Sequence, residues 1–226
     1  MAIDRLYLKG AADNNYVAVD TTYGYYLRWR RLSAPSVKVA YDEVPGANSA
    51  IDGTEDFGEV FYEDRELELG CVLPSSAWQT PYQNLCSAYH GKQVKISFGN
   101  DENYYWTGRL FVAEHDAKDH SLAMTARVYP YKFKKTETTV TFSGYGSGTP
   151  AFVQKSVVNG RMRVVPTVTI NAEAEIQWGN NTKVLSASSY PQTVRIDGLE
   201  LGENETLIVK VKSAQDVVIK YREGAL

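Results

Sequence analysis

The middle of the chain reads Val94-Lys-Ile-Ser-Phe-Gly-Asn-Asp-Glu-Asn-Tyr-Tyr-Trp-Thr-Gly-Arg-Leu-Phe-Val-Ala113. Apolar and polar residues alternate over 94–98, which is the period of a half-buried β-strand. Gly, Asn and Asp residues at 99–103 favour a turn, and strand character returns at 104–113, so the stretch predicts a β-hairpin. A polar turn at 114–120 then leads to an alternating run at 122–129, which predicts a third antiparallel strand.

A single helix is predicted immediately before this hairpin. Ser75 or Ser76 can cap its start, Pro81 suits its first turn, and Gly91 suits the position after its end. Five residues at helical spacing form one apolar stripe: Trp78, Tyr82, Leu85, Cys86 and Tyr89. We therefore expect a helix over about 76–90, in which Cys86 packs rather than reacts.

Strands are also expected over 24–41 and 59–73, on either side of a long loop at 42–58 that is rich in Gly, Asp and Asn. From Asp42 to Glu68 there are ten acidic residues and one basic residue, Arg65. A solvated loop and strand face accounts for this charge without any partner.

A change in composition near residue 136 predicts a boundary between a first domain, 1–136, and a second domain, 137–226. The second domain has short apolar runs at regular spacing and no helical period, which predicts a β-sandwich. The Asn159-Gly160 pair predicts a type I′ hairpin turn. Alternation assigns twelve residues to the inward face: Val168, Ile170, Ile176, Trp178, Val194, Ile196, Leu207, Val209, Val211, Val217, Ile219 and Tyr221. The fold class is thus all-β with one α-helix.

Composition excludes several classes of function. The net charge of −3 gives no positive field for nucleic acid, and no apolar run has the length of a membrane span. The N-terminus carries no apolar core of signal-peptide length, so we expect a cytosolic chain in which Cys71 and Cys86 are free thiols.

Motifs for catalysis are weak. Glycines at 144–148 lack the helix that a phosphate loop needs, and Glu173 and Glu175 are ordinary for one face of a solvated strand. His115 and His120 lie in the expected turn at 114–120, where solvated side chains are a better interpretation than a metal site. We therefore predict no catalytic, cofactor-binding or metal-binding residues and no enzymatic activity.

The order of several segments resembles the distal tail proteins of long-tailed bacteriophages (siphophages), which are Dit-like ring proteins of the tail tip. The resemblance covers nearly the whole chain. The segments that carry it are Val44-Pro-Gly-Ala-Asn48, Ile51-Asp-Gly53, Val60-Phe-Tyr-Glu-Asp-Arg-Glu-Leu-Glu-Leu69, the helix ending His90-Gly91-Lys92, 94–98 with Asn100-Asp-Glu-Asn-Tyr-Tyr-Trp-Thr-Gly-Arg109, Pro130-Tyr-Lys-Phe133 and Val218-Ile-Lys-Tyr-Arg-Glu-Gly-Ala-Leu226.

The resemblance implies a split-barrel-like first domain that forms a hexameric ring and a galectin-like second domain. It implies a structural protein of the virion tail tip, made in the host cytoplasm, that joins the tail tube protein to the tail-tip hub protein and contacts a receptor-binding or tape-measure protein. It also gives the acidic stretch a role as a surface that repels passing DNA.

Two alternatives remain open. A tail-tube or tail-terminator ring protein belongs to the same class, although the helix and second domain favour the tip. A carbohydrate-binding sandwich would present aromatic and amide side chains to a sugar, and its residues would be Tyr145, Trp178, Asn180, Asn181 and Tyr190. Trp178 is equally well explained as a core residue, because it is in phase with Ile176.

Overall fold

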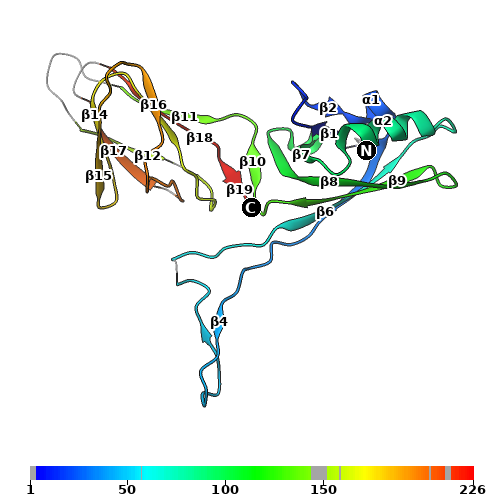
Figure 1. Ribbon diagram of the computed structural model, residues 1–226, viewed down its shortest axis with the longest axis horizontal. Coiled ribbons are helices and arrows are strands. Elements are labelled where there is room, and N and C mark those ends of the chain that lie inside the picture. The colour runs from blue at the N-terminus through cyan, green and yellow to red at the C-terminus, as the bar shows by residue number, and fades with distance from the viewer. Residues whose placement is uncertain (1–3, 57, 144–151, 158, 204, 212–214) are drawn as a thin grey trace. The chain divides into compact units, whose positions relative to one another are not determined.

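The chain folds into two compact units, Met1–Lys132 and Phe133–Leu226 (Figure 1). The computed structural model describes residues 4–56, 58–143, 152–157, 159–203, 205–211 and 215–226. Each unit has a hydrophobic core of its own. The division between Lys132 and Phe133 lies close to position 136, where the composition changes.

The first unit is built on an antiparallel sheet with the strand order β2-β1-β7-β8-β9-β6-β3. Ile96 pairs with Trp106, and Leu110 pairs with Ala126, so the predicted hairpin and third strand are confirmed. Strand β8 continues to Asp116, which shortens the turn that was expected at 114–120. The strands are β1 (Leu6–Lys9), β2 (Val17–Ala18), β3 (Tyr26–Leu32), β6 (Arg65–Val72), β7 (Gln93–Phe98), β8 (Tyr104–Asp116) and β9 (Ser121–Val128).

The predicted helix is α2 (Gln79–Tyr89). Its residues Leu85 and Tyr89 are buried, and Gly91 has the positive φ of 71° that a residue after a helix end often adopts. The expected capping by Ser75 or Ser76 is wrong, because Trp78 precedes the first helical residue and no side chain caps that end.

The expectation of a single helix is also wrong. A five-residue helix, α1 (Val19–Tyr23), and a short 3-10 helix, η1 (Gly99–Asp101), accompany α2. Helix α1 is too short for a periodic apolar stripe, so its sequence gives no helical signal. It is anchored by the buried Val19 and by an edge-to-face contact of Tyr23 with Tyr89 at 6.1 Å.

One face of the sheet is apolar and closed, and the other is open. Inward residues of β8 and β9, such as Leu110 and Met124, are fully buried together with Leu85 of α2. The outward residues between them are exposed. Arg30 of the edge strand β3 lies 3.4 Å from Asp4, which precedes β1 near the other edge, so the sheet curls back on itself.

An arm of residues 33–64 leaves the sheet between β3 and β6 (Figure 1). It is a thin ribbon in which β4 (Tyr41–Asp42) pairs with β5 (Ile51–Asp52) and Val37 pairs with Tyr62. None of the described residues between 33 and 64 is buried. The long loop that the sequence predicts is therefore an extended hairpin.

The second unit contains two four-stranded sheets, in the orders β11-β18-β13-β16 and β12-β17-β14-β15. Ten of the twelve predicted inward residues are buried in one core between these sheets, and Trp178 and Val194 pack against it, which confirms the alternation. The strands are β11 (Thr138–Phe142), β12 (Phe152–Val157), β13 (Thr167–Ile170), β14 (Ala174–Trp178), β15 (Asn181–Leu185), β16 (Gln192–Val194), β17 (Glu205–Val211) and β18 (Val217–Tyr221).

The hairpin turn predicted at Asn159-Gly160 is wrong. Strand β12 pairs with β17 instead of with the residues that follow it. The Asn159 side chain is buried and donates hydrogen bonds to the carbonyl oxygens of Met162 and Leu201. A Cβ at Gly160 would lie 2.2 Å from the carbonyl oxygen of Gly224, so glycine is required there for close approach rather than for a turn.

The last residues of the chain are tied to the start of the second unit. Arg222 donates hydrogen bonds to the carbonyl oxygens of Lys134 and Lys135, at 2.7 and 2.6 Å. Glu223 accepts a hydrogen bond from Thr138 and forms an ion pair with Lys134 at 3.1 Å. Two short strands, β10 (Lys132–Lys134) and β19 (Gly224–Ala225), pair beside these contacts. The chain thus enters and leaves this unit at one place.

The two faces of the first sheet predict opposite responses at adjacent positions. Leu110→Ala should lower the free energy of unfolding by about 3 kcal/mol, because it empties space in a closed core. Phe111→Ala, at a 46% exposed outward position, should change it by less than about 1 kcal/mol. Urea unfolding followed by tryptophan fluorescence measures both, and equal losses would contradict the assignment of faces.

Candidate assembly surfaces

His115 belongs to a buried aromatic cluster under α2 rather than to a solvated turn. It is 5% exposed, its ring stacks on Trp78 with 4.4 Å between centroids, and its Nδ1 lies 3.2 Å from the Tyr25 hydroxyl. A bulge in β8 between Val112 and His115 changes the alternation there. The interpretation of His115 as a solvated residue is therefore wrong, and the sequence could not reveal the bulge.

Burial lowers the pKa of His115, and the nearby His120 lowers it further. Burial also raises the pKa of Tyr25 to about 12 and that of the Cys71 thiol to about 12. Nε2 of His115 and Nδ1 of His120 are buried and have no hydrogen-bond partner among the described residues. Burial therefore favours the neutral forms of His115, Tyr25 and Cys71.

The lowered pKa of His115 predicts a loss of stability in mild acid. The unfolded state binds the proton more readily than the folded state, so stability is complete above the ordinary pKa of about 6.5 and falls as the pH drops below it. His115→Gln should reduce this slope between about pH 7.5 and 5, as measured by urea unfolding at several pH values.

Lys118→Gln is the matched control, because Lys118 is an exposed residue of the turn next to β8. The substitution removes a positive charge three residues from His115 without removing an imidazole. An undiminished slope in His115→Gln would show that other groups cause the acid sensitivity.

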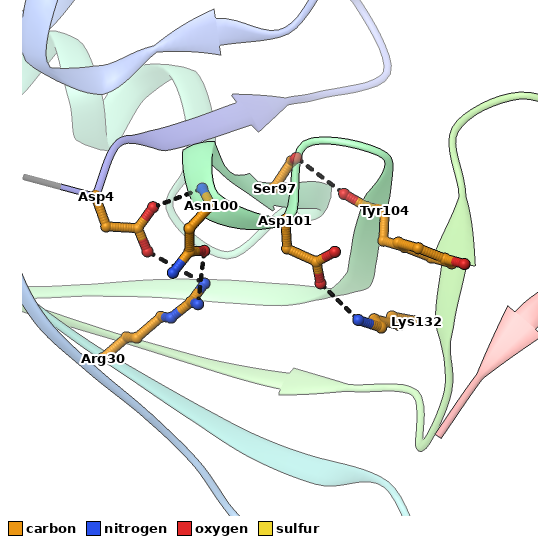
Figure 2. Close-up of polar contacts among 7 residues, drawn as sticks. All are labelled: Asp4, Arg30, Ser97, Asn100, Asp101, Tyr104 and Lys132. Carbon is orange, nitrogen blue, oxygen red and sulfur yellow. Dashed lines mark hydrogen bonds and ion pairs between the residues drawn. The ribbon is translucent and has the colours of Figure 1, made fainter. Parts of the chain in front are cut away.

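Polar side chains connect the two edges of the sheet where the curl brings them near each other (Figure 2). Arg30 forms an ion pair with Asp4, donates a hydrogen bond to Asn100 at 2.8 Å, and lies 3.9 Å above the ring of Phe98. Asp4 also accepts a hydrogen bond from the Asn100 backbone at 3.1 Å. Beside them, Asp101 pairs with Lys132 at 2.6 Å. The contacts of Arg30 join β3 to the start of β1 and to helix η1, with which β3 shares no backbone pairing.

Arg30→Ala should lower the free energy of unfolding by about 1 kcal/mol, since it removes a partly exposed ion pair and one cation–π contact. Arg30→Lys should recover only part of this, because an ammonium group lacks the planar fork that bonds Asp4 and Asn100 together. Urea titration with Arg31→Ala as the exposed neighbouring control checks the prediction. Equal stability of wild type and Arg30→Ala would contradict the closing role.

The outward face of the sheet holds a hollow of about 450 Å³. Arg109 and Arg127 lie directly opposite each other on β8 and β9, and like charges in such pairs repel. Phe111 and Tyr129, which are 46% and 49% exposed, add apolar surface. The residues that line the hollow are Asp64, Gln93, Thr107, Gly108, Arg109, Phe111, Arg127 and Tyr129. Sequence reasoning missed this site, although large aromatics at polar positions of alternating strands signalled it.

The arm is a second surface without a covering layer. The side chains of Val39, Tyr41 and Ile51 are 58%, 60% and 60% exposed. Val37, Val44 and Phe61 are each more than 40% exposed. Exposed apolar side chains gathered on one thin element are typical of an interaction site.

Of the predicted sugar-binding residues that the structure describes, Trp178 and Asn181 are brought together, because they are paired across β14 and β15. Tyr145 lies outside the described residues. Trp178 packs against the core of the second unit, and its indole nitrogen donates a hydrogen bond to the Gly198 carbonyl at 3.0 Å. Asn180 is exposed in the turn between β14 and β15, Asn181 is the exposed first residue of β15, and Tyr190 is 40% exposed in a different loop. The carbohydrate site stays a prediction.

No cluster of three or more His, Cys, Asp or Glu side chains among the described residues could hold a metal ion. Within the same residues, no helix has the length and apolar character needed to cross a membrane. Cys71 and Cys86 are free thiols, as expected.

Comparison with known proteins gives similarity at the level of structure. No family model matches the sequence, and no curated protein is significantly similar to it. Two structures of a phage p2 baseplate in its activated conformation, with Sr and with Ca, align at 10% and 7% identity over 97% and 99% of this chain and 98% and 99% of theirs, with TM-scores of 0.43 and 0.45.

A further solved structure is much more similar. The SPP1 Dit (gp 19.1) protein, described as a paradigm of the hub adsorption apparatus in phages that infect Gram-positive hosts, aligns over 100% of both chains at 16% identity with a TM-score of 0.67. The resemblance to distal tail proteins is thereby confirmed at the level of the fold. This chain shares the β-rich fold of the SPP1 Dit protein from end to end.

Proposed function

We propose that this chain is a structural protein of the tail tip of a long-tailed bacteriophage. In this proposal it forms a hexameric ring that joins the tail tube to the tail-tip hub and has no enzymatic activity. The observation that carries the proposal is the alignment with the SPP1 Dit protein over the whole of both chains. A tail-tube ring is less well supported, because the alignment includes the second unit as well as the first.

The proposed division of labour follows the two units. The first unit is the split-barrel-like, ring-forming domain, and its uncovered arm and outward hollow are the surfaces available for assembly. The second unit is the galectin-like sandwich, which has a closed core of its own and needs no partner to bury it. Contacts with the tube protein, the hub protein and a receptor-binding or tape-measure protein complete the proposal.

Native mass spectrometry and negative-stain electron microscopy of the purified full chain test this function. We expect a closed ring with six times the mass of the chain and a central opening. A chain that remains monomeric up to about 100 µM would contradict the ring, because ordinary stable interfaces are populated well below that concentration. Saccharide titration of the same sample tests the carbohydrate alternative separately.

A further inference from the structure

The arm and the outward hollow have complementary chemistry. Between residues 33 and 64 the sequence holds eight acidic residues and one basic residue, Lys38. At the tip of the arm, Asp42, Glu43 and Asp52 alternate with the exposed Tyr41 and Ile51. The hollow instead combines two facing arginines with two exposed aromatic rings.

Neither surface is satisfied within one copy. A two-stranded ribbon is only marginally stable in water without a surface beneath it. Of the residues that line the hollow, only Asp64, at the base of the arm, comes from the arm. Asp64 pairs with Arg127 at 2.9 Å, whereas the Arg109 side chain donates a hydrogen bond to the Gly91 carbonyl oxygen. Among the described residues, the tip of the arm therefore packs on no covering layer, and Arg109 has no carboxylate partner.

We propose that the tip of the arm of one copy binds the outward hollow of the next copy, with Asp42 and Glu43 opposite Arg109 and Tyr41 against Phe111. The two surfaces are different patches of the same chain, so the contact is head-to-tail, and repetition of such a contact produces a ring when the rotation closes. The inference rests on the proposed function and names the interface that the ring would use.

The length of the arm fits this arrangement. Residues 33–44 form one leg, and twelve extended residues span at most roughly 40 Å. A unit of about 130 residues has a radius of gyration near 14 Å, and so a width of about 35 Å. The tip can thus reach across one neighbouring unit. An arm that instead lined a channel would keep Tyr41 and Ile51 in water, which disfavours the DNA-repelling role for this tip.

Charge reversal tests the pairing. Asp42→Lys combined with Glu43→Lys, and separately Arg109→Glu, should each raise the dissociation constant for self-association roughly 100-fold. The triple variant restores opposite charges and should recover to within about tenfold of wild type. Lys183→Glu, an exposed residue of β15 in the second unit, is the control and should leave association unchanged. Sedimentation velocity over a range of concentrations measures all four. A triple variant weaker than either parent would overturn the proposal.

Crosslinking locates the contact and separates this inference from the proposed function. A photoreactive benzoylphenylalanine at position 41 is activated in an equal mixture of ¹⁵N-labelled and unlabelled chains. We expect crosslinked peptides of mixed isotope composition that contain residues from 104–129. If rings form but the crosslinks map elsewhere or within one chain, the inference fails and the ring stands. If the wild-type chain stays monomeric, both fail.

Discussion

The first unit depends on one geometric constraint, which is that its main helix is too small for its sheet. Helix α2 has 11 residues and is therefore about 16 Å long, whereas seven strands spaced about 4.8 Å apart span roughly 29 Å. A flat sheet would leave much of its apolar face in water. The curl of the sheet removes this problem, because opposite edges approach and the strands cover one another. Large buried rings such as Tyr25 and Tyr89 fill the enclosed space.

The curl also decides where the polar groups go. Where the two edges of the sheet approach each other, side chains make the hydrogen bonds. Arg30 there connects segments that share no backbone pairing. The exposed aromatic and charged groups of this unit lie on the outer face and the arm. Facing arginines at Arg109 and Arg127 repel each other in an isolated sheet, and none of the described residues of the arm is buried. Exposed apolar surface of this kind is typical of an interaction site.

Sequence patterns predicted the parts of the fold in which one face is buried. The hairpin at 94–113, the strand after it and the inward residues of the sandwich follow from alternation, and the stripe containing Leu85 and Tyr89 predicted α2. The failures have local causes. Helix α1 is shorter than one apolar repeat, and a bulge moved His115 into the core.

Other failures came from tertiary contacts that no local pattern encodes. Asn159 and Gly160 are a favourable pair for a turn. The Asn159 amide instead donates hydrogen bonds to two distant or neighbouring carbonyl oxygens, and a third carbonyl oxygen lies close to Gly160. Of the two candidate surfaces, the sequence indicates the arm but not the hollow. The acidity of the arm can be counted in the sequence, whereas the opposition of Arg109 and Arg127 depends on strand register. The fold of a distal tail protein was predicted from the order of segments rather than from any physical signal in them.

The tie between Arg222, Glu223 and residues 134–138 has a consequence for how such a chain can change. Because these contacts hold the first and last strands of the second unit side by side, and because the core of the unit is closed, the unit meets the usual conditions for a domain that tolerates circular permutation.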